Sequence, residues 1–241
     1  MRDLYCGVYG MIKAIFHAHS GTYSMVKKLG FTHVEIARNA WPGSYDLMKT
    51  AILSAHSQGL NVIVEPWTYG PNKEFLCNKG LAFLKEIQPI LYADDLIMGP
   101  DEPNLNNIGP YEIAVLNQDI KHILPNKTLI TLSSIKSFQA YANTVDIIAV
   151  NYQGRMADLF RVIKLSFQLL AFRIIHLGEV WGVPSIKIGP SHIRGQKVFF
   201  NILGIENLFW YSFSLDGGKW SPDGKTDLGG LPEWQKAIMD S

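Results

Sequence analysis

Two glutamates stand where a pair of carboxyl groups could work together. Glu102 follows a short apolar run that ends at residue 99, and Glu179 closely follows another that ends at residue 177. One carboxylic acid can protonate a leaving oxygen while a second carboxylate attacks carbon or activates water. This is the chemistry that cleavage of a glycosidic bond requires, provided that the fold brings both groups to one site.

Tryptophan is frequent in this chain, and most of the Trp residues lie at or near the ends of apolar runs, as the two glutamates do. Of six Trp residues, only Trp234 lies in a predicted helix, and the other five fall at the ends of apolar runs or just after them: Trp41, Trp67, Trp181, Trp210 and Trp220. Sugar rings stack their C–H faces on Trp, whereas a packing role would reflect the usual burial of this residue. Five such residues at one end favour binding.

The elements that must position these residues alternate along the chain. Short β-rich runs are separated by amphipathic stretches, and they cover residues 4–9, 33–37, 61–65, 96–99, 129–132, 145–150, 173–177 and 208–213. Strict alternation predicts parallel strands with right-handed crossovers. Eight units in 241 residues is the size of a closed barrel. We therefore expect an α/β fold, a single (β/α)8 TIM barrel that occupies residues 1–241 as one domain.

A doubly wound open sheet is the competing topology. It usually carries a glycine-rich phosphate loop after the first strand, and the segment from Gly7 to Gly10 does not match that fingerprint. Between the runs, Ser44 predicts a helix start and Gly59 its end. The apolar face expected for this helix comprises Leu47, Met48, Ala51, Ile52 and Ala55.

In a barrel of this kind the active site lies at the carboxyl ends of the strands. The residues that follow the predicted strands are therefore the candidates for contact with substrate. Besides the two glutamates, they are Arg38, Trp41, Glu65, Trp67, Asp101, Asn104, Asn151, Tyr152, Trp181, Trp210 and Trp220.

Four of these positions resemble the retaining (β/α)8-barrel glycoside hydrolases with catalytic Glu after strands four and seven. The matching residues are Glu102 before a proline, Glu179, Tyr152 and Trp210. The resemblance implies a glycosidase without cofactor or metal, in which Glu102 is the acid/base and Glu179 the nucleophile. It also implies that Tyr152 orients the nucleophile and that Trp210 lies under the sugar.

One residue departs from that pattern, because Asp101 stands where these enzymes carry an Asn that donates to a sugar hydroxyl. An ionised Asp only accepts hydrogen bonds. Its negative charge should raise the pKa of Glu102, which suits an acid. The departure leaves open whether the reaction retains or inverts configuration.

Each candidate also has a purely structural interpretation. Glu102 could cap the following helix, and Glu179 could pair with Arg173 or Arg38. Glu65 could bind sugar or be a buried partner of Arg38. Asn104 and Asn151 either donate to substrate hydroxyls or close turns.

Two other classes of function compete with a glycosidase. The pair His17 and His19 resembles the His-x-His pair that ends strand one in metal-dependent amidohydrolase barrels. Those enzymes need further His ligands after strands five and six, where this chain has Ser133, Ser134, Asn151 and Tyr152. The pair is also expected in the loop after the first strand. A barrel that binds glycan without cutting it is the third class, and the presence of both glutamates argues against it.

Composition excludes several partners. The net charge is +1 and charged residues make up 18%, so there is no field to hold nucleic acid or an anionic membrane. Two cysteines are too few for a disulfide framework or a four-ligand zinc site. No secretion signal is visible, so a cytoplasmic location and a monomer that acts on carbohydrate are the default expectations.

Overall fold

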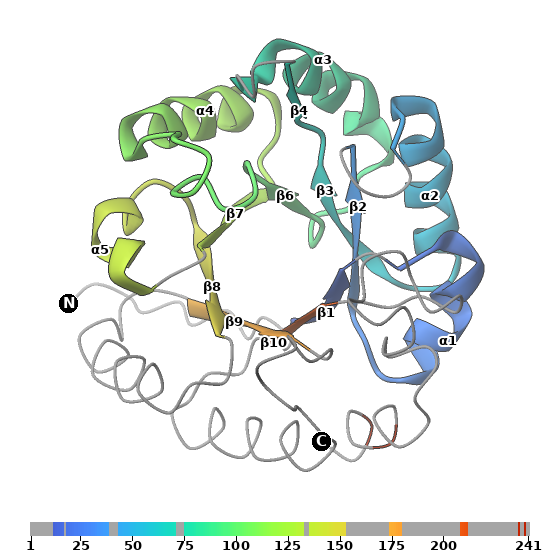
Figure 1. Ribbon diagram of the computed structural model, residues 1–241. Coiled ribbons are helices and arrows are strands. Elements are labelled where there is room, and N and C mark those ends of the chain that lie inside the picture. Colours follow the sequence, from blue (N-terminus) through green and yellow to red (C-terminus); the bar gives the residue numbers. More distant parts are fainter. Residues whose placement is uncertain are drawn as a thin grey trace, which may run out of the picture.

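The computed structural model describes residues 12–16, 18–38, 43–70, 75–132, 135–152, 174–179 and 208–211, with Lys236 and Met239. Eight parallel strands form a closed barrel, in the order β1-β10-β9-β8-β7-β6-β3-β2 (Figure 1). In chain order they are β1 (Lys13–Phe16), β2 (His33–Ala37), β3 (Asn61–Glu65), β6 (Leu96–Met98), β7 (Lys127–Leu132), β8 (Ile147–Tyr152), β9 (Ile174–Glu179) and β10 (Leu208–Tyr211). The ring confirms the predicted parallel α/β architecture.

The helices of the described residues lie outside the ring of strands (Figure 1). They are α1 (Tyr23–Lys28), α2 (Tyr45–Ser57), α3 (Cys77–Ile87), α4 (Pro110–Ile123) and α5 (Phe138–Tyr141), with short 3-10 helices η1 (Ser20–Thr22), η2 (Gln88–Ile90) and η3 (Ile135–Ser137). Helix α2 begins as predicted, because the Ser44 hydroxyl accepts the Leu47 N–H at 3.3 Å. The helices expected after β8, β9 and β10 lie outside the described residues, so the complete eightfold repeat stays a prediction.

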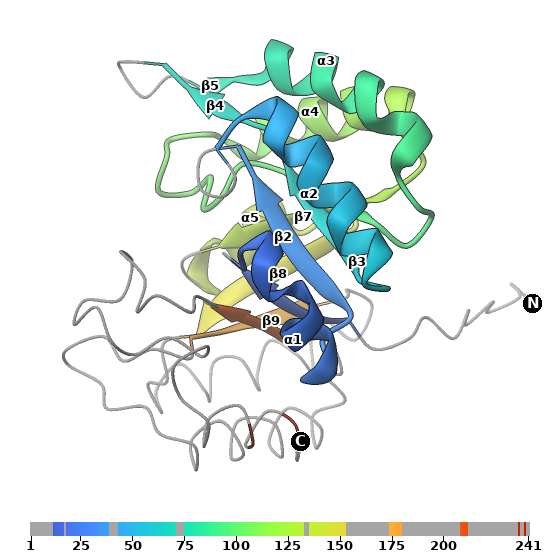
Figure 2. The same cartoon turned by 90° about the vertical axis from the view of Figure 1, so that its right-hand side faces the viewer.

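A small antiparallel pair stands apart from the barrel. Strands β4 (Thr68–Tyr69) and β5 (Phe75–Leu76) follow β3 and precede α3. The pair lies at the same end of the barrel as the green segment that follows β6 (Figure 2). This is the end at which the sequence places the site. No helix in the described part of the chain is long and apolar enough to cross a membrane.

Strand alternation divides the barrel into an inner and an outer core. The inner set is Ala14, Phe16, Ile63, Leu96, Met98, Leu129, Ile147 and Ala149. The outer set, between strands and helices, includes Ile15, Val34, Ile36, Val64, Ile97, Ile130, Leu132 and Ile148. Because neighbouring residues of a strand face opposite sides, the polar residues Glu35, Glu65 and Thr131 hold inner positions. All three are buried.

The first barrel strand differs from the prediction. Residues 13–16, and not residues 4–9, fill the place between β10 and β2, where Ile15 pairs with Trp210 on one side and Val34 on the other. Residues 4–9 lie outside the described part of the chain. Both runs are apolar, so the local pattern could not choose between them, and the pairing partners decide. Strands β8 and β9 also end two residues later than predicted, at Tyr152 and Glu179.

Candidate active site

Glu102 lies in a tight turn just beyond β6. The turn is joined to β7 at its start, where the Gly99 N–H donates to the Leu129 carbonyl at 2.7 Å. Gly99 permits this close approach, because a Cβ there would stand 2.8 Å from the Ile130 side chain. Glu102 itself has a φ of 43°, in the left-handed region that is strained for a residue with a side chain. Such strain persists only where neighbouring contacts hold it.

The hydroxyl of Thr131, on β7, supplies such a contact. It accepts the Glu102 N–H at 2.9 Å and donates to a carboxylate oxygen of Asp101. The Glu102 carbonyl in turn accepts the Leu105 N–H at 2.8 Å. Helix α4 begins only at Pro110, and its N-cap is Gly109, whose N–H donates to Glu112 at 2.6 Å. The structural interpretation of Glu102 as the cap of that helix is therefore wrong.

Glu65 ends β3 beside this turn and is buried. Its carboxylate accepts the Asp101 N–H, and burial raises the pKa of Glu65 well above its usual range. The negative charges of Asp101 and Glu35 raise the pKa further, whereas the N–H bond opposes the rise. Three carboxyl groups thus interact at this end of the barrel, which favours at least one of them in the neutral form.

Arg38 does not neutralise this group. Its backbone N–H donates to the Glu65 carbonyl at 2.8 Å, but its guanidinium donates to the Gly43 carbonyl. The guanidinium also stands 5.3 Å from the centre of the Tyr45 ring. The alternative in which Arg38 is the ion-pair partner of Glu65 is therefore wrong. The prediction that either residue contacts sugar stays a prediction.

Asp101 and Tyr69 complete the polar group around Glu65. Exclusion of water from the Asp101 carboxyl raises its pKa, although the residue as a whole is exposed, and the bonds from Thr131 and the Glu102 N–H oppose the rise. The pKa of Tyr69 is raised by burial and then by the charges of Glu65 and Asp101. The Tyr69 hydroxyl is buried and has no hydrogen-bond partner among the residues that the structure describes. A hydroxyl donor beside two carboxyl groups is suited to a ligand oxygen.

Glu179 is the last residue of β9, the seventh strand of the barrel. It pairs with Tyr211, which in turn pairs with Phe16 of the inner core. Glu179 therefore stands at the carboxyl end of its strand, in register with the last residue of β10. Strands β7 and β8 separate it from the strand that precedes Glu102.

Tyr152 is the last residue of β8, where it pairs with Gly178 of β9. Trp210 lies in β10 between the same Gly178 and Ile15 of β1. The roles expected for Tyr152, Trp210 and Asn151 at the site stay predictions.

Trp67 is a packing residue, so its prediction as a wall of the site is wrong. Its side chain is 0% exposed, and its indole N–H donates to the Met98 carbonyl at 2.5 Å. The ring lies against Gly80 of α3, where an added Cβ would stand 2.5 Å from the indole. The centres of the Trp67 and Phe75 rings are 5.7 Å apart. A ring with no exposed surface cannot stack on a sugar.

The remaining candidates are only partly placed. Asn104 is half-buried in the turn that carries Glu102. Trp41, Trp181 and Trp220 lie outside the described residues. The residues that sequence reasoning missed are Thr131, Tyr69 and Glu35. Thr131 and Glu35 could have been found as polar residues inside otherwise apolar runs.

His19 follows the first barrel strand, as expected, in the segment between β1 and η1. His17 lies outside the described residues. His19 is exposed, and its carbonyl accepts the Thr22 N–H at 2.8 Å. Within the described ranges, no three His, Cys, Asp or Glu side chains are grouped to hold a metal ion.

A hollow of about 830 Å³ opens between residues 105–108, α4 and the start of α3, and Leu105 and Tyr111 in its lining are exposed. Among the described residues, none of the predicted site residues lines it.

The fold is similar to solved structures of three glycoside hydrolase families. A family 113 β-1,4-mannanase has a TM-score of 0.67 and 11% identity, over 96% of this chain and 98% of that one. A family 128 endo-β-1,3-glucanase from Amycolatopsis mediterranei, in complex with laminarihexaose, has a TM-score of 0.61 and 12% identity, over 96% and 100%. A family 17 β-1,3-glucanosyltransferase from Rhizomucor miehei has 0.58 and 12%, over 90% and 96%.

Sequence comparison adds nothing to this, since no protein-family model and no curated protein matches the chain. At such low identities the structural likeness establishes the barrel fold alone.

Proposed function

We propose that this chain is a glycoside hydrolase acting on a β-linked hexose polysaccharide, as a single (β/α)8 domain over residues 1–241. One observation carries the proposal: Glu102 and Glu179 follow or end strands four and seven of a closed parallel barrel. The substrate class is taken from the similar structures, which include mannanases and β-1,3-glucanases.

In this proposal Glu102 is the general acid. It gives its proton to the glycosidic oxygen as the bond from that oxygen to the anomeric carbon breaks. Glu179 attacks the anomeric carbon from the opposite face and forms a glycosyl-enzyme. Glu102, now ionised, takes a proton from water, whose oxygen bonds to the anomeric carbon and displaces Glu179. No cofactor or metal takes part in these steps.

The other residues of the site would bind the sugar. The Tyr69 hydroxyl and the carboxyl groups of Glu65 and Asp101 offer one donor and several acceptors for substrate hydroxyls. Retention of configuration requires the two catalytic carboxyl groups to lie about 5 Å apart, and inversion requires about 6.5–9.5 Å. The proposed mechanism, in which Glu179 is a nucleophile, therefore requires the shorter separation of about 5 Å.

The test is hydrolysis of laminarin, a β-1,3-glucan, and of β-1,4-mannan by the purified protein. We expect the wild type to release reducing ends from one of them. Glu102→Gln and Glu179→Gln should each reduce the rate about 10³-fold, since each removes a group that acts in the transition state. Their melting temperatures should stay close to that of the wild type. The NMR signal of the first product anomer distinguishes retention from inversion.

The matched control is Glu86→Gln, because Glu86 is exposed on α3 and its ion pair, with Lys49, is also on the surface. It should keep full activity. Binding of either polysaccharide without release of reducing ends would identify a glycan-binding barrel instead. Full activity in Glu179→Gln would overturn the assignment of the two carboxyl groups.

A further inference from the structure

Thr131 connects the two residues of the turn that matter most for the chemistry. Its side chain is 0% exposed at an inner position near the end of β7, the strand next to β6. Its oxygen accepts the Glu102 N–H at 2.9 Å, and its single hydroxyl proton goes to the Asp101 carboxylate. Because that proton is committed to Asp101, the oxygen lone pairs remain available for the Glu102 N–H.

The turn needs such a contact, because Glu102 has a left-handed backbone. A φ of 43° is strained in a residue with a side chain. The turn is also held on its other side, where the Asp101 N–H donates to the carboxylate of Glu65 on β3. Two neighbouring strands thus hold the segment after β6. The Glu102 N–H is accepted by two side chains, the neutral hydroxyl of Thr131 and the carboxylate of Asp101. Thr131 bonds both to this N–H and to that carboxylate, so it links the two.

We propose that Thr131 is a positioning residue for Glu102, which it holds in place through the hydrogen bonds of its hydroxyl to the Glu102 N–H and the Asp101 carboxylate. The inference rests on the proposed function, in which Glu102 is the general acid. Without the hydroxyl, the turn loses its hydrogen bonds to β7, so the left-handed conformation of Glu102 is held less firmly and its carboxyl group shifts. A displacement of about 1 Å can reduce a rate about 100-fold.

The test measures how much a substrate depends on protonation of its leaving group. The probes are aryl β-glycosides of the disaccharide unit of whichever polysaccharide the wild type cleaves, with phenol or 2,4-dinitrophenol as leaving group. Dinitrophenolate departs without a proton, whereas phenolate needs one. In Thr131→Val we expect kcat/KM to fall about 100-fold for the phenyl glycoside. It should change less than about threefold for the dinitrophenyl glycoside.

Two further variants make the result specific. Thr131→Ser keeps the hydroxyl and should restore most of the activity on the phenyl glycoside. Thr128→Val is the matched control on the same strand, because the Thr128 hydroxyl is also buried but bonds to Asn117 and Asp146. It should lower the stability and leave the ratio of the two kcat/KM values at its wild-type value. Thr131→Ala replaces Thr131→Val if the latter does not fold.

Equal losses of kcat/KM on the two glycosides in Thr131→Val, or no loss on either, would overturn the role of Thr131 and leave the proposed function standing. A lack of rescue by Thr131→Ser would do the same. A wild-type protein that cleaves neither polysaccharide would instead overturn the proposed function, and this assignment with it.

Discussion

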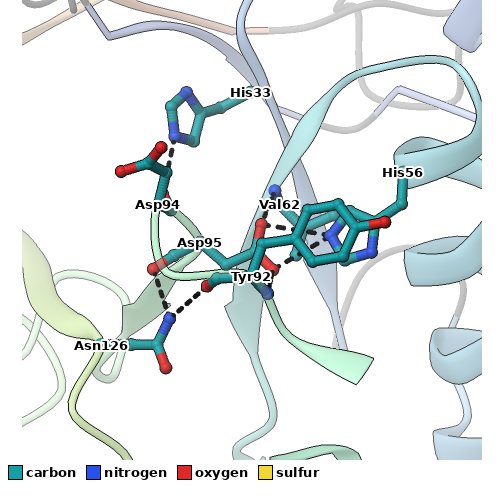
Figure 3. A network of polar contacts seen from close by, with 7 residues as sticks. All are labelled: His33, His56, Val62, Tyr92, Asp94, Asp95 and Asn126. Carbon is teal, nitrogen blue, oxygen red and sulfur yellow. Dashed lines mark hydrogen bonds and ion pairs between the residues drawn. The ribbon is translucent and has the colours of Figure 1, made fainter. Parts of the chain in front are cut away.

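Buried carboxyl groups at the two ends of the barrel have opposite surroundings, hydrogen-bond donors at one end and other carboxyl groups at the other. At the amino end of the strands, the fully buried carboxylate of Asp95 accepts the ring N–H of His56 at 3.0 Å, the Val62 N–H at 2.8 Å and the Tyr92 N–H at 2.6 Å (Figure 3). The Asn126 amide joins the Tyr92 and Asp95 carbonyls at 2.8 and 2.9 Å. At the carboxyl end, Glu65 faces the charges of Asp101 and Glu35 instead.

This difference separates a structural network from a candidate site. A buried polar group whose hydrogen bonds are all made stabilises and fixes the fold. Three features of the carboxyl end oppose folding instead. The carboxyl groups repel one another, Glu102 has a strained φ, and the buried Tyr69 hydroxyl has no partner among the described residues. Such features concentrate at functional sites. The same division holds in barrels generally, where one end serves stability and the other chemistry.

The largest effect on stability is expected at the amino end. Asp95→Asn replaces one acceptor oxygen with an amide that faces N–H donors, so the free energy of unfolding should fall by about 3 kcal/mol. Urea denaturation measures this change. The rate per folded molecule should stay at the wild-type value, because the network lies at the opposite end from Glu102.

Asp94→Asn is the control for that experiment. Asp94 is the neighbouring residue and is exposed, and its carbonyl, which the substitution retains, accepts the ring N–H of His33 at 3.1 Å. Its stability should match the wild type. Equal losses in both variants would show that charge in this segment, and not the buried network, sets the stability.

A smaller effect with the opposite sign is expected at the carboxyl end. The folded-state pKa of Glu65 is raised, so the neutral form is favoured in the folded protein, and the wild type should lose stability as the pH rises from about 4.5 through that pKa. Glu65→Gln keeps an oxygen for the Asp101 N–H and removes the charge. It should therefore be more stable than the wild type at pH 8 and differ little from it at pH 4.

Urea denaturation midpoints at the two pH values measure this difference. Glu86→Gln, which removes an exposed carboxylate, should keep the pH dependence of the wild type. If Glu65→Gln instead destabilised the protein at pH 8, the ionised Glu65 would be a stabilising group and the contrast between the two ends would fail.

The smallest effect concerns packing beside the site. Gly80→Ala adds a Cβ that would stand 2.5 Å from the Trp67 ring, a strain of about 1–3 kcal/mol. The better helix propensity of Ala offsets about 1 kcal/mol of this. We expect a net loss of about 1 kcal/mol in the free energy of unfolding.

Gly21→Ala is the matched substitution, because no atom lies within 4 Å of a Cβ built there. It should be neutral or slightly stabilising. A neutral Gly80→Ala would mean that Trp67 moves easily, and its ring would then return as a candidate for contact with sugar.

Much of the fold could be predicted from local patterns. The strands at residues 33–37 and 61–65 have the bounds that their apolar runs indicate, and Ser44 begins α2 as expected. The local pattern predicts the first strand at residues 4–9, whereas β1 covers Lys13–Phe16, because both runs are apolar and only the pairing with neighbouring strands distinguishes them. The ends of β8 and β9 were placed two residues too early, since polar residues such as Asn151 belong to the strand only through pairing with a neighbour.

The sequence by itself determined the alternation of strands and helices that predicts a parallel barrel, because apolar runs and helix signals act over a few residues. It also placed Glu102 and Glu179 at strand ends. Only the tertiary structure decided that Trp67 is buried, that Thr131 holds the Glu102 turn, and that Glu65 lies beside Asp101 instead of pairing with Arg38. These contacts join residues about 30 positions apart, so they depend on which strands are neighbours in the closed barrel and leave no local signal.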